Sequence, residues 1–227
     1  MDINKILAHC DHTILAPTTT WEEVRNLCDD AQTYHVASVC IPPCYVKQAS
    51  EYLDGNVKVC TVIGFPNGNT TRSMKLAEAR EAIENGADEI DMVINVGKVK
   101  EKDWTYVQDE IMDLVLLVNR MNSLQKRVIL KVIIETCLLT NEEIVHMCKI
   151  CGRVQADYIK TSTGFSTGGA TFEAVQLMLD TIKECGYDLK VKASGGISSI
   201  EDAEKYLEMG VDRLGTSKVV KIVKANT

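Results

Sequence analysis

A weak internal repeat constrains the fold of this chain more than any other feature of its sequence. Three times, a helix-like segment ends in a glycine or another small residue, an acidic residue follows, and a short apolar run comes next. The three copies are residues 84–93, 154–160 and 208–215. Glycine just past a helix end supplies a left-handed cap, and the apolar run after it is typical of a buried strand. Each copy therefore predicts a helix, a tight turn and a strand.

The same pattern, followed along the chain, predicts eight strands that alternate with helices. The expected strands lie near residues 11–15, 37–41, 58–63, 89–94, 129–134, 158–161, 190–193 and 213–216. The expected helices lie near residues 21–34, 44–53, 71–85, 104–121, 141–151, 171–184 and 199–208. Strands that alternate with helices favour an α/β fold with a parallel sheet.

Eight such units in 227 residues fit a (β/α)8 TIM barrel, which typically takes about 250 residues. A doubly wound open sheet is the alternative architecture. No Pro/Ser-rich linker or shift of composition divides the chain. The sequence therefore predicts a single domain over residues 1–227.

Composition narrows the class of protein and its partners. No apolar run approaches the ~20 residues of a membrane-spanning helix, and no basic, then apolar, leader is visible, so we expect a cytoplasmic protein without a membrane partner. The net charge of −7 disfavours a nucleic-acid partner, because phosphate backbones require a basic face. Nine cysteines without a framework are expected to be reduced thiols.

Three lysines lie at or near the ends of predicted strands, where TIM-barrel enzymes carry their functional residues. They are Lys131, Lys160 and Lys192, and each would be costly to bury because desolvation disfavours the charged form. For Lys131, exposure to solvent or a charge pairing with Glu135 is an alternative to a functional role. Lys160 and Lys192 are each followed at once by a turn of small residues, which favours a functional role for both.

Two glycine-rich loops follow the last two predicted strands, at residues 194–197 and 215–217. Backbone N–H groups of such loops can face an anion, and barrels of this class frequently hold phosphate at this place. For the glycine pair taken alone, an ordinary turn is the alternative. The residues expected to bind substrate or phosphate are Gly164, Ser194, Gly195, Gly196, Gly215, Thr216 and Ser217.

Seven segments in the same order give the chain a close resemblance to the deoxyribose-phosphate aldolases of the shorter, bacterial-type group. They are residues 11–13, 37–40, 59–66, 89–95, 131–136, 160–165 and 191–197. The resemblance covers nearly the whole chain and implies a class I aldolase, which forms a Schiff base and needs no metal and no cofactor. The implied reaction is the reversible cleavage of 2-deoxy-D-ribose 5-phosphate to acetaldehyde and D-glyceraldehyde 3-phosphate, in deoxyribonucleotide catabolism. The implied partners are thus a small phosphorylated sugar, a short aldehyde and, in a homodimer, a second copy of the chain.

The resemblance assigns three catalytic roles. Lys160, in the KTSTG motif, forms the imine, while Lys192 and Asp91 donate and accept protons. The chemistry of these residues agrees, because an amine attacks a carbonyl only when unprotonated and a second ammonium nearby disfavours the charged form. Further residues expected to line the substrate site are Asp11, Thr13, Cys40, Thr61 and Lys131.

Two departures from the family pattern fall at the expected phosphate end. Ser198 stands where many relatives carry arginine, and Lys218 follows Ser217 where many continue with serine and glycine. Lys218 is expected to replace the missing positive charge. For Cys40, the alternative to substrate contact is a small buried hydrophobe. Alternative functions are another Schiff-base sugar-phosphate aldolase or transaldolase-like enzyme, and a non-catalytic phosphosugar-binding barrel.

Overall fold

Eight parallel strands close into a barrel in this computed structural model, which describes residues 2–122 and 127–226. The strands follow one another in chain order, and β8 pairs with β1 to close the ring. They are β1 Cys10–Thr13, β2 Ser38–Ile41, β3 Lys58–Ile63, β4 Glu89–Val93, β5 Ile129–Ile133, β6 Tyr158–Lys160, β7 Lys190–Ser194 and β8 Arg213–Thr216. The closed ring confirms the predicted TIM barrel and excludes the open sheet.

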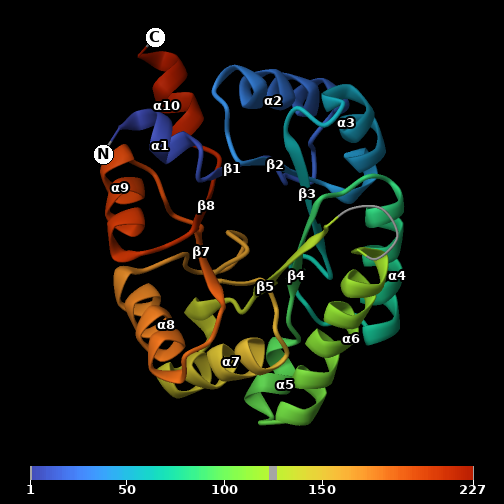
Figure 1. Ribbon diagram of the computed structural model, residues 1–227, viewed down its shortest axis with the longest axis vertical. Helices are drawn as coiled ribbons and strands as arrows, with labels where there is room; N and C mark the ends of the chain where they lie inside the picture. The colour runs from blue at the N-terminus through green and yellow to red at the C-terminus, as the bar shows by residue number, and fades with distance from the viewer. Residues whose placement is uncertain (1, 123–126, 227) are drawn as a thin grey trace.

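Helices surround the barrel, as Figure 1 shows. They are α1 Ile3–Leu7, α2 Trp21–Thr33, α3 Val46–Leu53, α4 Arg72–Glu84, α5 Val96–Lys100, α6 Trp104–Asn122, α7 Asn141–Arg153, α8 Phe172–Cys185, α9 Ile200–Met209 and α10 Val219–Ala225, with short 3₁₀ helices at Pro43–Tyr45 and Thr136–Leu138. The sequence did not predict α1, α5 or α10. Within the described parts of the chain, every helix is too short or too polar to cross a membrane.

Capping residues set the ends of several helices. Thr20 accepts a hydrogen bond from the backbone N–H of Glu23, whose carboxylate accepts one from the backbone N–H of Thr20, and Thr140 and Glu143 repeat this box before α7. Gly210 ends α9 with a φ of 103°, a conformation that favours glycine. These local signals explain why the expected and observed helix ends agree closely.

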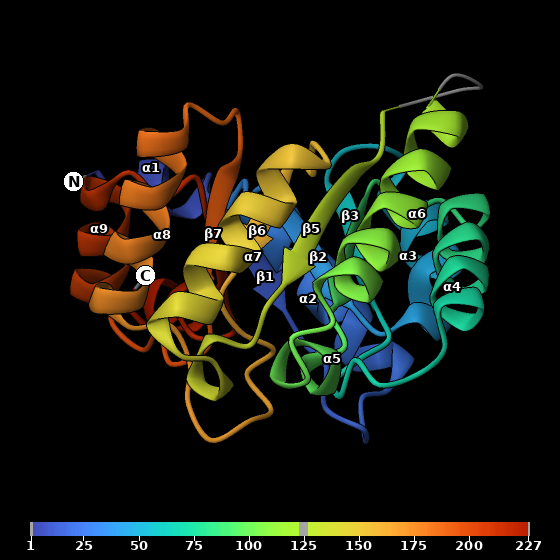
Figure 2. The same ribbon diagram turned by 90° about the horizontal axis from the view of Figure 1, so that it is seen from below.

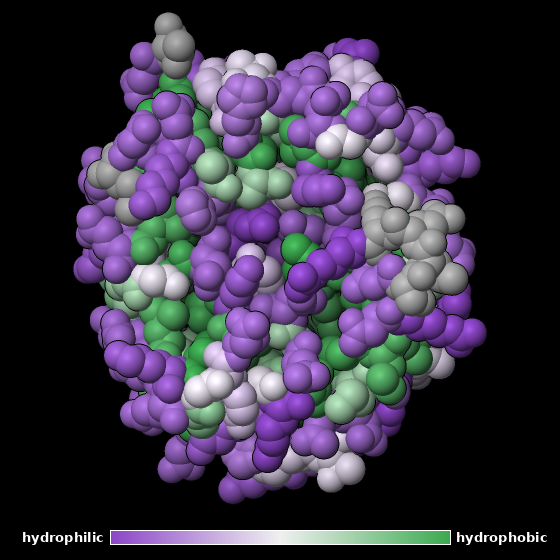
Figure 3. All heavy atoms as spheres, viewed as in Figure 1, coloured by the Kyte–Doolittle hydropathy of each residue, from purple (hydrophilic) through white to green (hydrophobic). Residues whose placement is uncertain are grey.

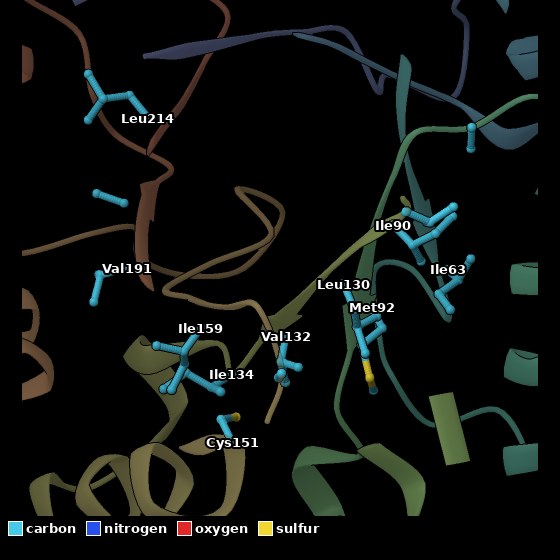
Figure 4. Packing of buried hydrophobic residues seen from close by; sticks show 14 of the residues in the cluster. Ile63, Ile90, Met92, Leu130, Val132, Ile134, Cys151, Ile159, Val191 and Leu214 are labelled. Carbon is cyan, nitrogen blue, oxygen red and sulfur yellow. The ribbon is translucent and has the colours of Figure 1, made fainter. Parts of the chain in front are cut away.

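The main hydrophobic core lies between the strands and the helices. In Figure 4, Met92, Val132 and Ile159 point from their strands toward the helices, and Cys151 of α7 lies near Ile159. Because successive strand residues face opposite sides, the neighbours of these residues face the barrel interior. That interior holds buried charged side chains, including Asp91.

The strands all point to one end of the barrel. Figure 2 shows α5, which follows β4, at the lower edge, and the arrowhead of β5 points the same way. The loops after the strands therefore gather at this end, where barrel enzymes place their active sites. Seen as in Figure 1, the surface is mainly hydrophilic, with hydrophobic residues showing between the helices (Figure 3).

Candidate active site

A cavity of about 570 Å³ opens at the C-terminal ends of β1, β6, β7 and β8 and extends to α2 and α10. Most of the residues expected to contact substrate or phosphate line it. They are Thr13, Lys160, Gly164, Ser194, Gly195, Gly196, Gly215, Thr216, Ser217 and Lys218. The structure thus brings the expected imine lysine and both glycine-rich loops to one cavity.

Lys160 lies at the floor of this cavity and is 4% exposed. Its Nζ donates a hydrogen bond to Oδ2 of Asp91 at 2.7 Å, and Nζ of Lys192 donates to the same oxygen at 2.7 Å. Lys160 and Lys192 are register partners on β6 and β7, while Asp91 reaches them from β4. The three residues with expected catalytic roles are therefore in direct contact.

Lys131 lies beneath the cavity and not on its wall, where it was expected to line the substrate site. Its side chain is fully buried, its Nζ donates to Oδ1 of Asp91 at 2.7 Å, and it pairs with Glu89 at 2.7 Å. The alternatives of solvent exposure and of pairing with Glu135 are wrong. Glu135 instead accepts a hydrogen bond from the N–H of Thr163 at 3.2 Å.

Asp11 joins the same network from β1, but it is fully buried and does not line the cavity, although it was expected to line the substrate site. Lys192 donates to one oxygen of Asp11, and Arg213 of β8 donates to the other at 2.6 Å. Arg213 also reaches Glu89 at 3.3 Å. Sequence reasoning missed both Glu89 and Arg213. Strand alternation could have found them, since each lies two residues before an inward-facing site residue.

The network leaves one cation without a carboxylate of its own. Among the described residues it joins four cationic and three carboxylate side chains: Lys131, Lys160, Lys192, Arg213, Asp11, Glu89 and Asp91. Burial opposes the ionisation of Asp91, but the three lysines outweigh it and hold the pKa of this carboxyl well below its usual range. Burial likewise opposes the charge of Lys192, yet Asp11 and Asp91 raise its pKa above the ordinary value. Lys192 is therefore a cation at neutral pH.

The glycine pair after β7 shapes the wall of the cavity. Gly195 and Gly196 both have a φ of 78°, where a side chain would be strained. A Cβ on Gly195 would also lie 3.1 Å from the Cα of Gly169 in the preceding loop. Ser194 is fixed beside them, because its hydroxyl donates to the carbonyl of Ser162 at 2.5 Å. The backbone here faces the cavity without side chains in front of it.

Two lysines stand at the outer end of the cavity. Lys218 and Lys221 both line it, next to residues of α2 such as Asp30. Lys218 therefore lines the same cavity as the glycine-rich loops, and its replacement of the absent arginine stays a prediction. Sequence reasoning missed Lys221, because the N-cap residue of α10, Lys218, makes no side-chain cap hydrogen bond and gives no start signal.

Thr61 does not face the cavity, although it was expected to line the substrate site. It is fully buried, and its hydroxyl donates to the carbonyl of Ile41 at 2.8 Å. In β3 it alternates with Cys60, which faces the interior, so it shares the outward direction of Val59. A side chain one position away from an inward residue points to the opposite side of the sheet.

Cys40 is buried inside the barrel and does not reach the cavity wall. It packs with Cys60 in a small cluster that Leu15 and Phe65 cover, and Leu15 lines the cavity. A hydrogen bond from Cys60 lowers the pKa of the Cys40 thiol, whereas burial raises the pKa of Cys60. The structure favours the buried alternative for Cys40.

An apolar wall of the cavity was not expected from the sequence. Phe165, at 48% exposed, lines the cavity and meets the ring of Phe65 edge to face, with ring centroids 5.3 Å apart. Leu15 lies on the same wall. The cavity therefore has a polar, glycine-rich side and an apolar side.

Comparison with known proteins gives one consistent result. The family model "DeoC/LacD family aldolase" matches residues 5–217. A deoxyribose-phosphate aldolase of Streptococcus agalactiae is 52% identical over 224 residues, which are 99% of this chain and 96% of that protein. A structure from Coccidioides immitis, provisionally named as the same enzyme, is 40% identical with a TM-score of 0.93, over 100% of this chain and 87% of that one. The deoxyribose phosphate aldolase of Aeropyrum pernix, described as tetrameric, is 32% identical with a TM-score of 0.88. The match covers 100% of this chain and 94% of that one.

Proposed function

The chain belongs to the deoxyribose-phosphate aldolases of the DeoC/LacD family and is a lyase, and from this premise we propose how its residues act. We propose that it cleaves 2-deoxy-D-ribose 5-phosphate reversibly to acetaldehyde and D-glyceraldehyde 3-phosphate through a Schiff base on Lys160. The observation that carries this proposal is the single oxygen of Asp91 that both Lys160 and Lys192 contact at 2.7 Å, at the floor of the cavity.

The charge balance of the network supports Lys160 as the nucleophile. Lys131 and Lys192 each contact at least two carboxylates, whereas within residues 2–122 and 127–226 the carboxylate that Lys160 contacts is that of Asp91, through an oxygen it shares with Lys192. Four cationic side chains face three carboxylates, and Lys160 is the lysine that has no second carboxylate among the described residues. Lys160 is also the lysine of these three that lines the cavity. It is therefore the amine best placed to attack a carbonyl.

The reaction follows from an amine at this position. The nitrogen of Lys160 adds to the C1 aldehyde of the open-chain sugar, and loss of water leaves an imine. Removal of the C3 hydroxyl proton then breaks the C2–C3 bond, whose electron pair forms an enamine, and the three-carbon aldehyde phosphate leaves. Protonation at C2 and hydrolysis release acetaldehyde and restore the amine. Asp91 and Lys192 lie beside the reacting nitrogen and exchange the protons of these steps.

The phosphate end of the substrate is proposed to lie at the two glycine-rich loops. Gly195 and Gly196 present backbone without side chains, and Lys218 and Lys221 supply positive charge at the same end. A phosphate bound there places the chain of the sugar along the cavity toward Lys160. Charge-assisted hydrogen bonds to phosphate are among the strongest available to a protein.

Reductive trapping tests the proposal. Borohydride added together with substrate should attach the mass of the reduced adduct to the peptide that carries Lys160. Lys192→Met is the matched variant, because it keeps the nucleophile and removes the neighbouring cation. An adduct on Lys192, or no adduct with an active protein, would overturn the assignment.

A turnover assay separates the proposed function from its alternatives. Release of acetaldehyde from 2-deoxyribose 5-phosphate is expected, and a chelator should not reduce it. Activity only with another donor would favour a different Schiff-base aldolase. Binding of the sugar phosphate without any turnover would favour the non-catalytic barrel.

We also propose that two copies associate and that the protein acts in the cytoplasm. The support for association is the family resemblance, and light scattering should give twice the mass of the chain. The support for the compartment is the state of the nine cysteines, which are free thiols in the structure, because thiols stay reduced in the cytosol.

A further inference from the structure

Two cysteines lie side by side within the barrel, next to the carboxylate of Asp91. Cys40 of β2 and Cys60 of β3 are register partners, and both are fully buried. Their sulfur atoms and one oxygen of Asp91 all lie within 4.8 Å of one another, and Sγ of Cys60 is 3.3 Å from Oδ1 of Asp91. Three donor atoms from three adjacent strands thus converge on one point.

This donor set has the chemistry of a soft-metal site. Zinc and similar ions bind thiolate sulfur at about 2.3 Å and carboxylate oxygen at about 2.0–2.2 Å, in tetrahedral geometry. Ligand atoms around such an ion lie about 3–4 Å apart, which is compatible with the spacing at Cys40, Cys60 and Asp91. Magnesium and calcium prefer oxygen ligands, so two thiols select against them.

Charge does not forbid a cation here, although Asp91 is surrounded by lysines. A divalent ion that enters as an aquo ion forms two metal–sulfur bonds, and each thiol gives up its proton to solvent. Two positive charges enter and two leave, so the net charge of the interior does not change. The ammonium of Lys131, 3.2 Å from Sγ of Cys60, then faces a thiolate in place of a thiol.

We propose that Cys40, Cys60 and Asp91 form a buried site for one soft divalent cation, such as Zn²⁺ or Cd²⁺, and that its occupancy inhibits the aldolase. The ion enters from the active-site cavity past Leu15, which lines that cavity and covers the cysteine cluster. The inhibitory part rests on the proposed function, since the ion binds Oδ1 in place of Lys131 and so disturbs the carboxylate whose other oxygen contacts Lys160 and Lys192. The binding part does not.

Spectroscopy with Cd²⁺ tests binding without reference to activity. The parent for the test carries Cys44→Ser, Cys137→Ser and Cys185→Ser, which remove the thiols that are not fully buried. Added Cd²⁺ should produce the ultraviolet thiolate-to-cadmium absorption, saturating at one ion per chain with release of two protons. The band should disappear in Cys60→Ser and in Cys40→Ala.

A matched variant controls for other buried thiols. Cys148→Ala and Cys151→Ala alter the buried pair on α7 and should keep the band. A circular dichroism spectrum like that of the parent shows which variants are folded. Because Cys60→Ser and Cys40→Ala are separate changes, either one that folds suffices for the test. A band that persists in folded Cys60→Ser, or that is lost in Cys148→Ala, would overturn the site.

Inhibition is then measured separately. Cd²⁺ should abolish acetaldehyde release from the parent at one ion per chain, and a chelator should restore it. If the parent binds one Cd²⁺ yet retains its turnover, the inhibitory role is wrong. If the parent releases no acetaldehyde even without Cd²⁺, the proposed function fails while the spectroscopic result still decides the site.

Discussion

At the scale of single residues, the site depends on a few carboxylates that each contact more than one cationic side chain. Asp91 contacts Lys131 through one oxygen and both Lys160 and Lys192 through the other. Asp11 relieves part of this demand, because it also pairs with Lys192. A change at Asp91 therefore disturbs three lysines at once.

Asp91→Asn should abolish most of the activity and weaken the fold. Loss of a proton-transfer group lowers kcat by about 10²–10⁴-fold, and an uncompensated buried charge costs about 3–5 kcal/mol of unfolding free energy. Acetaldehyde release and urea unfolding measure the two effects.

The control for that change is Thr61→Val, on the neighbouring strand but facing away from the cavity. This variant should lose some stability, because the hydrogen bond of Thr61 is removed, and it should keep the kcat of the wild type. A kcat as low as that of Asp91→Asn would contradict the outward placement of Thr61.

His12 should make stability depend on pH. Burial lowers its pKa to about 4 from an ordinary 6.5, despite the opposing charge of Asp30. The unfolded chain therefore binds a proton first, so the contribution of His12 is complete above pH 6.5 and is lost as pH falls toward 4. Between pH 7 and pH 5 this loss is about 2 kcal/mol. The free energy of unfolding in urea is measured at both pH values for the wild type and for His12→Asn. If it changes equally with pH in the two proteins, the prediction is wrong.

At the scale of elements, side chains on helices hold the ends of the strands that carry the site. Lys75 of α4 donates to the carbonyl of Val93 at 2.7 Å and pairs with Glu110 of α6 at 2.7 Å. Glu110 in turn accepts from the N–H of Asn95 at 3.0 Å. The pair therefore ties two helices to the end of β4, just past Asp91.

Lys75→Met should lower the free energy of unfolding by about 3–5 kcal/mol, because it leaves Glu110 charged and buried. Replacing both partners, as Lys75→Met with Glu110→Gln, should recover much of the loss, since the glutamine still accepts from Asn95. The pair Lys100–Glu143, in which the lysine side chain is 45% exposed, supplies the control, and Lys100→Met should cost less than ~1 kcal/mol. Equal losses in the two lysine variants would refute the argument.

The short helix α10 should decide affinity for the phosphate. Lys218→Gln with Lys221→Gln removes both cations at the outer end of the cavity. Each lost charged hydrogen bond is worth about 1.5–3 kcal/mol, so KM for the phosphorylated sugar should rise at least ~10-fold. KM for unphosphorylated 2-deoxyribose should not change. A parallel rise for both sugars would show that the lysines do not meet the phosphate.

At the scale of the whole molecule, the sequence predicts the barrel and most of the site, for reasons that differ by region. Strands β3 and β8 begin and end where predicted, because turn residues and apolar runs bound them. By contrast, α5 has an asparagine N-cap but spans only five residues, and α10 spans seven residues and begins without a side-chain cap, so neither gives a periodic pattern long enough to identify it.

Residues with a distinctive side-chain chemistry were easier to assign to the site than residues whose place in the site depends on which way the side chain points. Lys160 and Lys192 are followed by small-residue turns, which mark the strand ends. Thr61 was misplaced because a side chain's direction depends on a one-residue register. Lys131 was misplaced because its partners Glu89 and Asp91 lie on the neighbouring strand β4, and the pairing of strands far apart in the sequence is not visible in the local sequence.

The position of the Arg213 side chain has a consequence for how the active site forms during folding. This side chain comes from the last strand and meets Asp11 of the first and Glu89 of the fourth. Until β8 pairs with β1, both acids lack this shared cation, so the ion-pair network is one partner short. Closing the ring therefore also completes the network beneath the cavity, and a nascent chain that still lacks β8 cannot form it in full.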